Sequence, residues 1–419
     1  MVEKLKKYLE FITENTISVE MPIPYDIKEI SRAFNNAGKD IYVVGGAVRD
    51  FLQKKIPHDF DLVTNALPEE SKRILKGWNV SDEQGKNFGV LRIYTEDEPL
   101  GHELATFRKD ISGGRDTKGD DDKVEIGNHI TIEDDVKRRD LTINALFYDI
   151  NKKEIVDLVG GVKDIENNVI RAVGDPAERF KEDRLRILRV FRFAARAQGR
   201  KGGIISPETS RAIKSDNRLR GISTKEDVSQ ERIHEEWNKV IEHAEKGGNK
   251  ILENYIRLLT EYDMWEQMFP KLKISPDGFT PKPISAILFA HLLRDNDIRK
   301  LRKYMISELK FSSKLVNQIE FLLKLEKELD LHWKSFKNID VSNVYGLAKM
   351  KNQYHIDDDL IYEFLGEEFY KPFVDYCNDG FVVNGNDLAA EGFKGIEIEI
   401  EKKRREIVRF KNEYLMNDN

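Results

Sequence analysis

The spacing of apolar residues changes near residue 172, and that change is the strongest constraint on the fold. From residue 41 to about 172, short apolar runs alternate with glycine-containing and charged turns, a pattern typical of β-strands. The runs read IYVVGG, GVLRIY, HELATF, INALFYD and EIVDLVGG. After it, from DPAERF onward, the spacing is helical, with breaks at RKGGIISPET, ISPDGFTPKP and NDGFVVNGND. The sequence therefore predicts an α+β protein: a head with a small mixed sheet, N-terminal helices over residues 1–38, and an extended all-helical remainder.

Composition restricts the class of protein. Of the 419 residues, 40% are hydrophobic and 34% are charged, which is typical of a globular chain. No apolar stretch approaches the roughly 20 residues that a membrane-spanning helix needs, and the N-terminal stretch has no apolar signal core. Cys377 is the only cysteine, which excludes an intrachain disulfide and a cysteine-based zinc site. We therefore expect a cytoplasmic protein without a membrane partner, with a mitochondrial or nuclear pool if the source is eukaryotic. The oligomeric state stays open.

Positive charge is concentrated in one segment of an otherwise acidic chain. The formal net charge is −6, which by itself gives no support to a nucleic-acid partner. Between Arg171 and Lys201, however, ten Lys and Arg residues accompany only four acids, a local charge of +6. Such a segment is the usual electrostatic footprint of a polyanion site.

Two aspartates, Asp59 and Asp61, stand one residue apart in HDFDLVT. Side chains alternate along an extended segment, so both carboxylates would project to the same side. Carboxylates held together repel each other unless a cation lies between them, and Mg²⁺ prefers such oxygen ligands together with substrate phosphates. An isolated D-x-D is more often a solvated acidic turn, so this motif needs support from its surroundings.

The residues before the aspartates supply that support. In VVGGAVRD an apolar run ends at Gly45 and Gly46, and a helix is expected to begin near Ala47, with Arg49 in its first turn. Glycines let backbone N–H groups approach an anion, and a helix N-terminus favours phosphate. Either motif alone also fits an ordinary turn with surface charge. Their order and spacing together predict a site for metal and triphosphate.

The stretch GGAVRDFLQKKIPHDFDLVT resembles the signature of the tRNA nucleotidyltransferases and bacterial poly(A) polymerases, the class II branch of the polymerase-β-like nucleotidyltransferases. The resemblance covers residues 41 to about 240, through HELATFRKD, VKRRDLTINALFYD, IVDLVGGVKDIENNVIRAVGDP, RFKEDRLRILRVFRFAAR, ISPET and VSQERIHEEW. Later segments, DGFTPKPISAILFAHLLRD and FVVNGNDLAAEGFKG, are similar to the body and tail of CCA-adding enzymes. The resemblance implies a polymerase-β-like catalytic head (1–172), a nucleotide-selecting helical neck (173–245), a helical body (246–335) and a tRNA-binding helical tail (336–419).

Asp183 and Arg186, in FKEDRLRILRVFRF, are three residues apart and would share one face of a helix. The aspartate can accept from the amine of cytosine or adenine, while the arginine donates to neighbouring acceptors. Uracil and guanine present a carbonyl next to a ring N–H, and leaving such groups unpaired costs roughly 1–3 kcal/mol each. The pair can therefore admit C and A and exclude U and G, and the resemblance implies the same role. Out of context, the spacing is that of an ordinary surface ion pair.

Three arginines in this segment match nucleotide-contacting positions of the family, namely Arg186, Arg189 and Arg192. Arg196 continues their face of the helix, and we expect these arginines to contact the triphosphate and the RNA backbone. The apolar side would be Leu185, Leu188, Phe191 and Ala195. A solvated basic stripe is the alternative.

The head contributes further residues through the same resemblance. Arg139 and Asp140, in KRRDLTINA, match ribose and nucleotide contacts, with a salt-bridged turn as the alternative. Glu103, in HELATFR, is a provisional third carboxylate for the metal. The polar segment 108–136 is expected to be the family's mobile loop. Its stretch GGRDTKGDDDKVEIG is longer and more acidic than the family pattern, which bears on the switch from CTP to ATP.

The activity that the resemblance implies is template-independent addition of C, C and A to the 3′ end of tRNA. CTP and ATP would be the substrates, two Mg²⁺ ions on Asp59 and Asp61 the cofactors, and pyrophosphate the released product. The tRNA would be bound by the helical remainder at its acceptor and T-stem region.

Other functions stay open to different degrees. The shared head fits a poly(A) polymerase or an enzyme that adds only CC or only A, although EKKRREIVRFKNEYLMNDN carries only a short basic run. A non-catalytic tRNA-binding protein is disfavoured because both aspartates and the Asp183–Arg186 pair are present. A phosphohydrolase is disfavoured because His291, in FAHLLRDND, has no adjacent His–Asp doublet and is expected to be structural.

Overall fold

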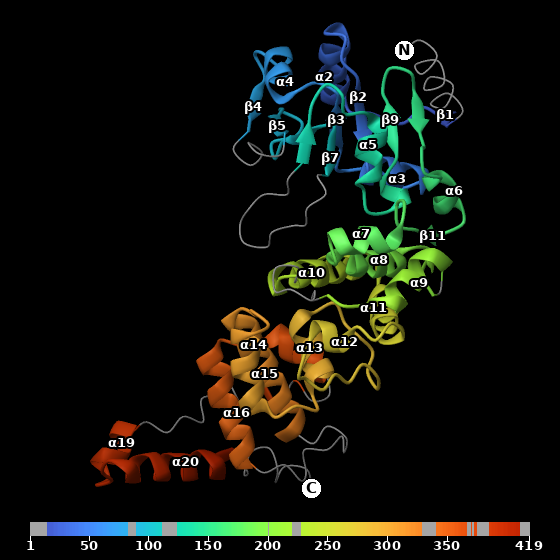
Figure 1. The fold of residues 1–419 in the computed structure, drawn as a ribbon. Helices are drawn as coiled ribbons and strands as arrows, with labels where there is room; N and C mark the ends of the chain where they lie inside the picture. Colours follow the sequence, from blue (N-terminus) through green and yellow to red (C-terminus); the bar gives the residue numbers. More distant parts are fainter. Residues whose placement is uncertain are drawn as a thin grey trace. The chain divides into compact units, whose positions relative to one another are not determined.

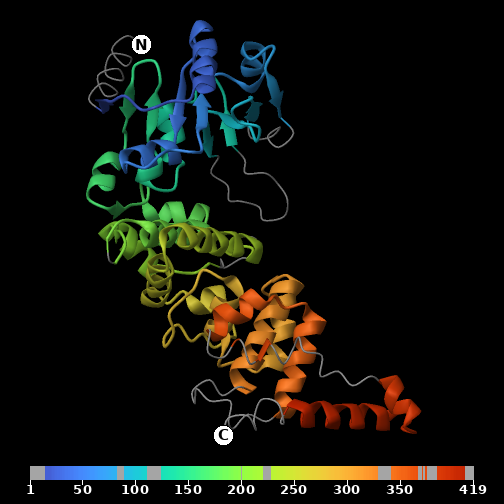
Figure 2. The same cartoon turned by 180° about the vertical axis from the view of Figure 1, so that it is seen from behind.

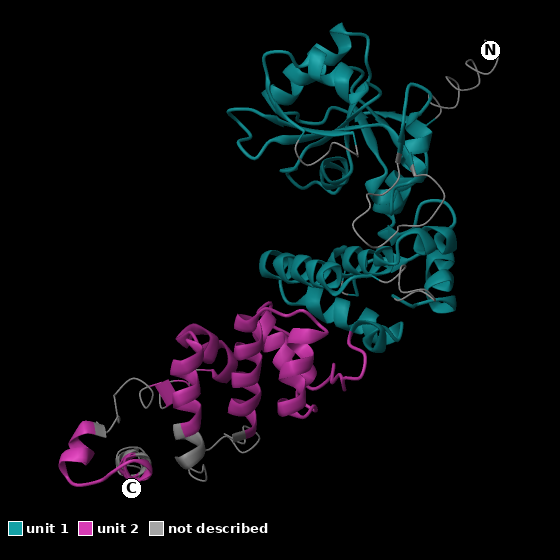
Figure 3. Ribbon diagram, turned by 60° about the vertical axis from the view of Figure 1, so that its left-hand side comes forward, with its two compact units in different colours: residues 1–268 teal, residues 269–419 magenta. Residues whose placement is uncertain are grey.

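The computed structural model (Figure 1) describes residues 15–82, 89–110, 124–199, 201–219, 228–328, 341–366, 370, 373–374 and 385–410. The chain forms two compact units, residues 1–268 and 269–419 (Figure 3). This division is coarser than the four predicted parts, which stay a prediction.

A mixed sheet forms the centre of the head. Its strands are β1 (Thr16–Ser18), β2 (Ile41–Val44), β3 (Asp61–Thr64), β4 (Asn79–Ser81), β5 (Val90–Tyr94), β6 (His102–Thr106), β9 (Phe147–Asp149) and β10 (Glu154–Val156). Their order is β1-β10-β9-β2-β3-β6-β5-β4. Figures 1 and 2 show the sheet and its helices from opposite sides. β3 and β6 are parallel, and the other neighbours are antiparallel. Two short ladders accompany the sheet: β7 (Arg108–Asp110) with β8 (Val124–Ile126), and β11 (Val169–Ile170) with β12 (Ile204–Ile205).

Helices cover both faces of the sheet. They are α2 (Tyr25–Asn36), α3 (Gly46–Leu52), α4 (Pro68–Ile74), α5 (Ile132–Lys137), the 3₁₀ turn η1 (Thr142–Asn144) and α6 (Gly161–Glu166). Successive strand residues point to opposite faces. Val43 and Leu62 accordingly join a core with α2 and α3, whereas Val44 and Val63 join another with α5. The loops at the ends of β2 and β3 are thereby fixed from both sides.

A group of helices continues unit 1. These are α7 (Pro176–Glu182), α8 (Leu185–Arg196), α9 (Pro207–Ser215), α10 (Gln230–Gly247), α11 (Lys250–Glu261) and α12 (Trp265–Met268). α8 packs against α10 and α11. Its predicted apolar side is confirmed, since the four residues of that side are all buried: Leu185, Leu188, Phe191 and Ala195.

Unit 2 is helical throughout its described elements. They are α13 (Ser285–Leu293), α14 (Ile298–Ser307), α15 (Ser313–Glu328), α16 (Val341–Tyr354), α17 (Asp358–Leu365), α19 (Gly385–Ala390) and α20 (Ile396–Phe410). α15 packs against α13, α14 and α16. In the described ranges of the whole chain, no helix has both the length and the apolar character needed to cross a bilayer. The predicted α+β class, with a mixed-sheet head and a helical remainder, is confirmed.

Two local predictions were wrong, and a third was wrong in part. Residues 16–18, predicted as helix, form β1, because pairing with β10 overrides the local apolar spacing; residues 1–14 lie outside the described ranges. The run INALFYD, predicted as a strand, begins as η1 before β9. The predicted loop 108–136 contains β7, β8 and most of α5, and most of its acidic stretch, residues 111–123, lies outside the described ranges.

Candidate active site

Gly45 forms the turn between β2 and α3. Its φ of +68° lies in the left-handed region, where a residue with a Cβ is strained, so glycine is required. A Cβ at this position would lie 3.7 Å from Nη1 of Arg139. The helix begins at Gly46, one residue before the predicted start, and a Cβ there would lie 3.7 Å from Nη2 of Arg49. Both guanidinium groups therefore lie next to the backbone at the start of α3, at distances that a Cβ would tolerate, and the strict need for glycine comes from the φ of Gly45.

The predicted metal-binding carboxylates gather beside this turn. Asp61 begins β3 and pairs with Val44, the last residue of β2. Asp59 lies two residues earlier and is exposed. β3 and β6 run parallel with Leu62 opposite Leu104, so Glu103 occupies the position next to Asp61. Asp61 and Glu103 thus lie on neighbouring strands, and Asp59 lies just before the first of these strands.

The proximity of these acids changes the acidity of Asp61. Burial, together with the charges of Asp59 and Glu103, raises the pKa of Asp61 to about 7, although Arg139 and Arg92 act in the opposite direction. A carboxylate with so high a pKa lacks sufficient positive charge nearby, which is a frequent property of functional sites.

Arg139 and Asp140 lie between the sheet and α8. Asp135, which is 1% exposed, holds Arg139 through Nη2 at 2.9 Å and Nε at 3.1 Å. The Arg139 guanidinium lies 4.7 Å from the centre of the Phe147 ring. Asp140 accepts hydrogen bonds from Arg189 Nε at 2.7 Å and from the backbone N–H of Leu141 at 2.8 Å. Both residues are therefore held in fixed orientations.

Arg189 and Arg192 converge on a carboxylate that the sequence reasoning missed. Glu236, in α10, is 0% exposed. Its Oε2 accepts from Arg192 Nε at 2.6 Å, and its Oε1 lies 3.9 Å from Arg189 Nη1. Arg189 thus connects Asp140 to Glu236. Only the glutamate's place among apolar helix neighbours, in RIHEEWNKV, could have indicated a buried charge.

The ion pair between Asp140 and Arg189 also changes the pKa of Asp140. Burial acts to raise the pKa of Asp140, but the charge and hydrogen bond of Arg189 outweigh it and hold that pKa below its ordinary value. Asp140 is therefore ionised at neutral pH, whereas Asp61 is poised to bind a proton or a cation.

Asp183 and Arg186 do not lie on one continuous helix, which corrects the predicted helical face. α7 ends at Glu182, and Asp183 has an extended backbone with φ −150° and ψ 105°. Its Oδ1 accepts from the N–H of Leu185 at 3.1 Å. Aspartate is common at such a junction because its short side-chain carboxylate accepts a hydrogen bond from a free backbone N–H at the start of a helix. The two residues remain neighbours, since the Arg186 N–H donates to the Asp183 carbonyl at 3.1 Å.

Both side chains of this pair have protein partners. Asp183 Oδ2 lies 2.9 Å from Nη2 of Arg232. Arg186 donates from Nη1 to Glu182 at 2.6 Å and from Nη2 to the Arg138 carbonyl at 3.1 Å. Residues 138–140 therefore contact α8 at two points, through the Arg138 carbonyl and the Asp140 carboxylate.

Arg49 folds between α3 and α8. Its Nη1 donates to Asn144 Oδ1 at 2.6 Å, its Nη2 lies 2.8 Å from Asp50 Oδ1, and its guanidinium lies 5.2 Å from the centre of the Phe193 ring. It is 7% exposed. Arg49 lies close to Gly46, and its predicted contact with the triphosphate stays a prediction.

The basic segment Arg171–Lys201 is largely paired with acids of unit 1. Arg179–Glu182 and Lys181–Glu178 are pairs within the segment. Acids outside it pair with Arg171 (Asp164 and Glu208), Arg184 (Asp216), Arg189 (Asp140) and Arg192 (Glu236). These outside acids balance most of the local charge of +6, which the sequence alone did not indicate.

Known proteins resemble the chain over the same region. Residues 41–171 match the poly(A) polymerase head domain. A CCA-adding enzyme of Lactobacillus helveticus is 33% identical over 302 residues, which is 70% of this chain and 69% of that enzyme. Poly(A) polymerase I of Salmonella typhi is 33% identical over 63% of this chain and 54% of its own length. A CCA-adding enzyme of Ligilactobacillus salivarius is 39% identical, but the match spans only half of its length.

The chain belongs to the tRNA nucleotidyltransferase and poly(A) polymerase family. Solved structures extend the likeness in fold beyond the head. A Bacillus stearothermophilus CCA-adding enzyme in complex with CTP superposes with a TM-score of 0.63 at 22% identity, over 94% of each chain. A Thermotoga maritima CCA-adding enzyme complexed with tRNA has the same TM-score at 20% identity, over 96% of this chain and 94% of that one.

Nucleotidyltransferases of this family generally depend on a divalent metal, and the donor set here fits one. Asp59 and Asp61 offer oxygen ligands of the kind Mg²⁺ takes, and the raised pKa of Asp61 shows that a cation would relieve repulsion. Glu103 stays provisional: its Oε2 lies 3.8 Å from Arg92 Nη2, and within the described ranges no three His, Cys, Asp or Glu residues converge as a metal site.

His291, which the sequence analysis set apart from catalysis, packs among aromatic rings of unit 2. Its ring stacks on Phe279 at a centroid distance of 4.7 Å and on Phe364 at 5.4 Å. Burial and the nearby charge of Arg294 lower its pKa to about 4. This neutral, stacked histidine has the structural surroundings expected from the sequence.

The raised pKa of Asp61 predicts a pH-dependent stability of the metal-free protein. The folded state binds this proton more tightly than the unfolded chain, so stability falls as pH rises from about 4, the unfolded pKa, to 7. Asp61→Asn should therefore raise the melting temperature at pH 8 in the presence of a chelator, and change it little at pH 4. Asp97→Asn, an equal charge change at an exposed site in the head, is the control. A melting temperature lowered by Asp61→Asn at pH 8 would contradict the prediction.

Proposed function

We propose that this protein is a metal-dependent nucleotidyltransferase that adds C, C and A to the 3′ end of tRNA from CTP and ATP, with release of pyrophosphate. The observation that carries the proposal is the match to the Lactobacillus helveticus CCA-adding enzyme, which covers about seven tenths of both chains and includes the candidate site. The match to a poly(A) polymerase covers less of either chain. A cytoplasmic location and a tRNA-binding role of the tail, residues 336–419, belong to the same proposal.

The reaction exchanges one bond at the α-phosphorus of the nucleotide for another. The 3′-hydroxyl oxygen of the RNA forms a bond to the α-phosphorus of the nucleotide, and the bond to the pyrophosphate oxygen breaks. We assign Asp59 and Asp61 as ligands of two Mg²⁺ ions; when bound, such ions lower the pKa of the attacking hydroxyl and stabilise the leaving pyrophosphate. The turn at Gly45 and Gly46, with Arg49 beside it, would face the triphosphate.

The neighbouring residues would fix the nucleotide. Arg139 and Asp140 are held by Asp135 and Arg189, so a ribose bound against them meets groups that need not reorganise. Arg189 and Arg192 are in turn held by Glu236. This chain of charge-assisted contacts supports the assignment of all four residues to nucleotide binding.

Base selection is assigned to Asp183 and Arg186. For a base edge to be read, the contact of Asp183 with Arg232 and those of Arg186 with Glu182 and the Arg138 carbonyl must give way, at least in part, to contacts with the base. A correct base offers Asp183 and Arg186 new hydrogen bonds in place of those that they lose. A wrong base leaves these two charged side chains without partners.

A poly(A) polymerase, or an enzyme that adds only CC or only A, is the second candidate, supported by the match to the Salmonella enzyme. The direct experiment incubates the protein and Mg²⁺ with tRNAs ending before, within or after CCA, and with each NTP, and sequences the products. Stopping at CCA supports the proposal. Extended A tails, or addition limited to CC or A, would replace it with the second candidate.

Asp59→Ala should abolish incorporation of both CMP and AMP, because each transfer uses the same metal ligands. Its affinity for tRNA should stay within about twofold of the wild type, since an exposed acid contributes little to binding a polyanion. Single-turnover incorporation and fluorescence anisotropy measure the two effects, and Asp97→Ala is the matched control. Normal turnover by Asp59→Ala would remove the metal assignment.

Exchanging the charges of the base-reading pair should change specificity rather than abolish transfer. Asp183→Arg combined with Arg186→Asp presents the reversed donor and acceptor order, so the preference should move toward UTP or GTP by roughly tenfold or more. The ratio of kcat/KM for each NTP measures it, with circular dichroism confirming the fold. An active variant that still selects C and A would refute the assignment.

A further inference from the structure

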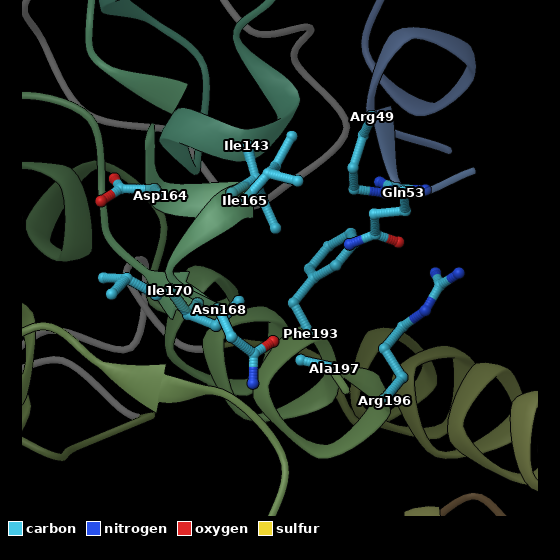
Figure 4. Close-up of a pocket in the computed structure, with 11 residues that line it drawn as sticks. Arg49, Gln53, Ile143, Asp164, Ile165, Asn168, Ile170, Phe193, Arg196 and Ala197 are labelled. Atoms are coloured by element: carbon cyan, nitrogen blue, oxygen red, sulfur yellow. The ribbon is translucent and has the colours of Figure 1, made fainter. Parts of the chain in front are cut away.

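A second basic site lies in a cleft at the far end of α3 from Gly45. Residues of α3, η1, α6, β11 and α8 line it, among them Gln53, Phe193 and Arg196. Figure 4 shows the Gln53 amide and the Arg196 guanidinium extending into the same space, with the Phe193 ring beside them. Asp164 is the one carboxylate among the lining residues.

The cations around this cleft differ in whether they have a counter-charge. Arg49 pairs with Asp50 at 2.8 Å. Arg192, which lies 4.5 Å from the centre of the Phe193 ring, pairs with Glu236 at 2.6 Å. These two guanidinium groups are therefore balanced by the fold.

Arg196 and Lys55 are not balanced in this way. Arg196 Nη1 lies 3.1 Å from His243 Nε2, and Lys55 Nζ donates to Gln53 Oε1 at 3.0 Å. In the part of the chain that the structure describes, neither cation has a carboxylate oxygen within 4 Å, and Asp50, the acid whose charge acts on both, is paired with Arg49. Asp164 bonds instead to Thr142 at 2.6 Å and to Arg171 at 3.0 Å, and its carboxylate points away from Arg196 in Figure 4.

The pKa values of Arg196, Lys55 and His243 reflect the same excess of positive charge. Burial and the charge of Arg49 lower the pKa of Arg196 to about 10. Burial and Arg196 lower the pKa of Lys55 and reduce that of His243 to about 3. His243 is therefore neutral at pH 7, while Arg196 keeps its charge on a half-buried side chain and Lys55 keeps its charge on an exposed one. A half-buried guanidinium without a carboxylate partner favours an anion.

We propose that Arg196, Lys55 and Gln53 bind a backbone phosphate of the RNA substrate. An arginine fork and an ammonium are suited to phosphate oxygens, and the Gln53 amide can donate a further hydrogen bond. The inference rests on the proposed function, because it requires an RNA substrate.

The position of the cleft favours RNA over the incoming nucleotide. The nucleotide residues gather at the N-terminal end of α3, near Gly45, whereas Gln53 follows its last residue, Leu52. The two ends of this helix are about 10 Å apart, and Arg196 lies two helical turns beyond Arg189. Arg49 lines the cleft as well, so the two sites adjoin, but a triphosphate bound at Gly45 and Arg49 would still leave Arg196, Lys55 and Gln53 for the nucleic-acid strand.

A purely structural role is the competing explanation. The carbonyl end of α3 carries partial negative charge, which Lys55 and Arg196 could complement. In that case their removal would lower thermal stability and leave RNA affinity unchanged. The two explanations therefore predict different effects on the affinity for RNA.

The test compares the wild type with Lys55→Gln, Arg196→Gln and the double variant, using fluorescence anisotropy of a labelled tRNA that lacks CCA across a salt series. Lys28→Gln with Lys76→Gln removes the same charge from exposed sites on α2 and after α4, as control. The double variant should bind roughly tenfold more weakly at 0.1 M salt, with a salt slope smaller by about one. The control should bind as the wild type does.

The other outcomes are separable. Unchanged tRNA affinity, with or without a lower melting temperature, would overturn the phosphate site. Weaker CTP binding with normal tRNA binding would assign the cations to the nucleotide and also overturn it. A wild type that binds no tRNA would overturn the proposed function itself. Lys55 is exposed, so its single variant keeps the test decisive if the Arg196 variants fail to fold.

Discussion

The candidate site depends on the ion pair between Asp140 and Arg189, which joins the sheet-containing head to α8 within unit 1. Asp140 is held in place by Arg189, Asn144 and its own neighbour Leu141, and Arg189 extends the connection to Glu236 in α10. Removing Arg189 would leave the largely buried Asp140 carboxylate without its counter-charge, which is more costly than losing a surface pair. The arrangement therefore fixes the residues that we assign to the nucleotide before any ligand binds.

The site contains two groups of acids in opposite electrostatic states. Asp140 and Glu236 are compensated by arginines, and they orient other side chains. Asp61 is crowded by Asp59 and Glu103, with positive charge insufficient to offset burial and repulsion. This contrast supports a division of labour in which compensated acids position the nucleotide and the uncompensated ones receive metal ions.

Much of this could be predicted from the sequence because the motifs are local. A strand, two glycines, a short helix and a second strand determine where Gly45, Asp59 and Asp61 lie, and the apolar side of α8 follows from its period. Contacts between distant segments could not be predicted in this way. The burial of Glu236, the pairing of β1 with β10 and the break at Asp183 each depend on a partner far away or on a cap that competes with helix continuation. The same reason explains why most of the described cations between Arg171 and Arg196 have acidic partners.

The central claim is that Asp59 and Asp61 hold metal ions next to a nucleotide whose base Asp183 and Arg186 read. Anomalous diffraction from crystals of the protein containing Mn²⁺ and CTP tests it most directly. The account predicts manganese bound by the carboxylates of Asp59 and Asp61, with the triphosphate beside Gly45 and the cytosine amine at Asp183. Manganese bound at other carboxylates, or a cytosine that contacts neither Asp183 nor Arg186, would contradict it.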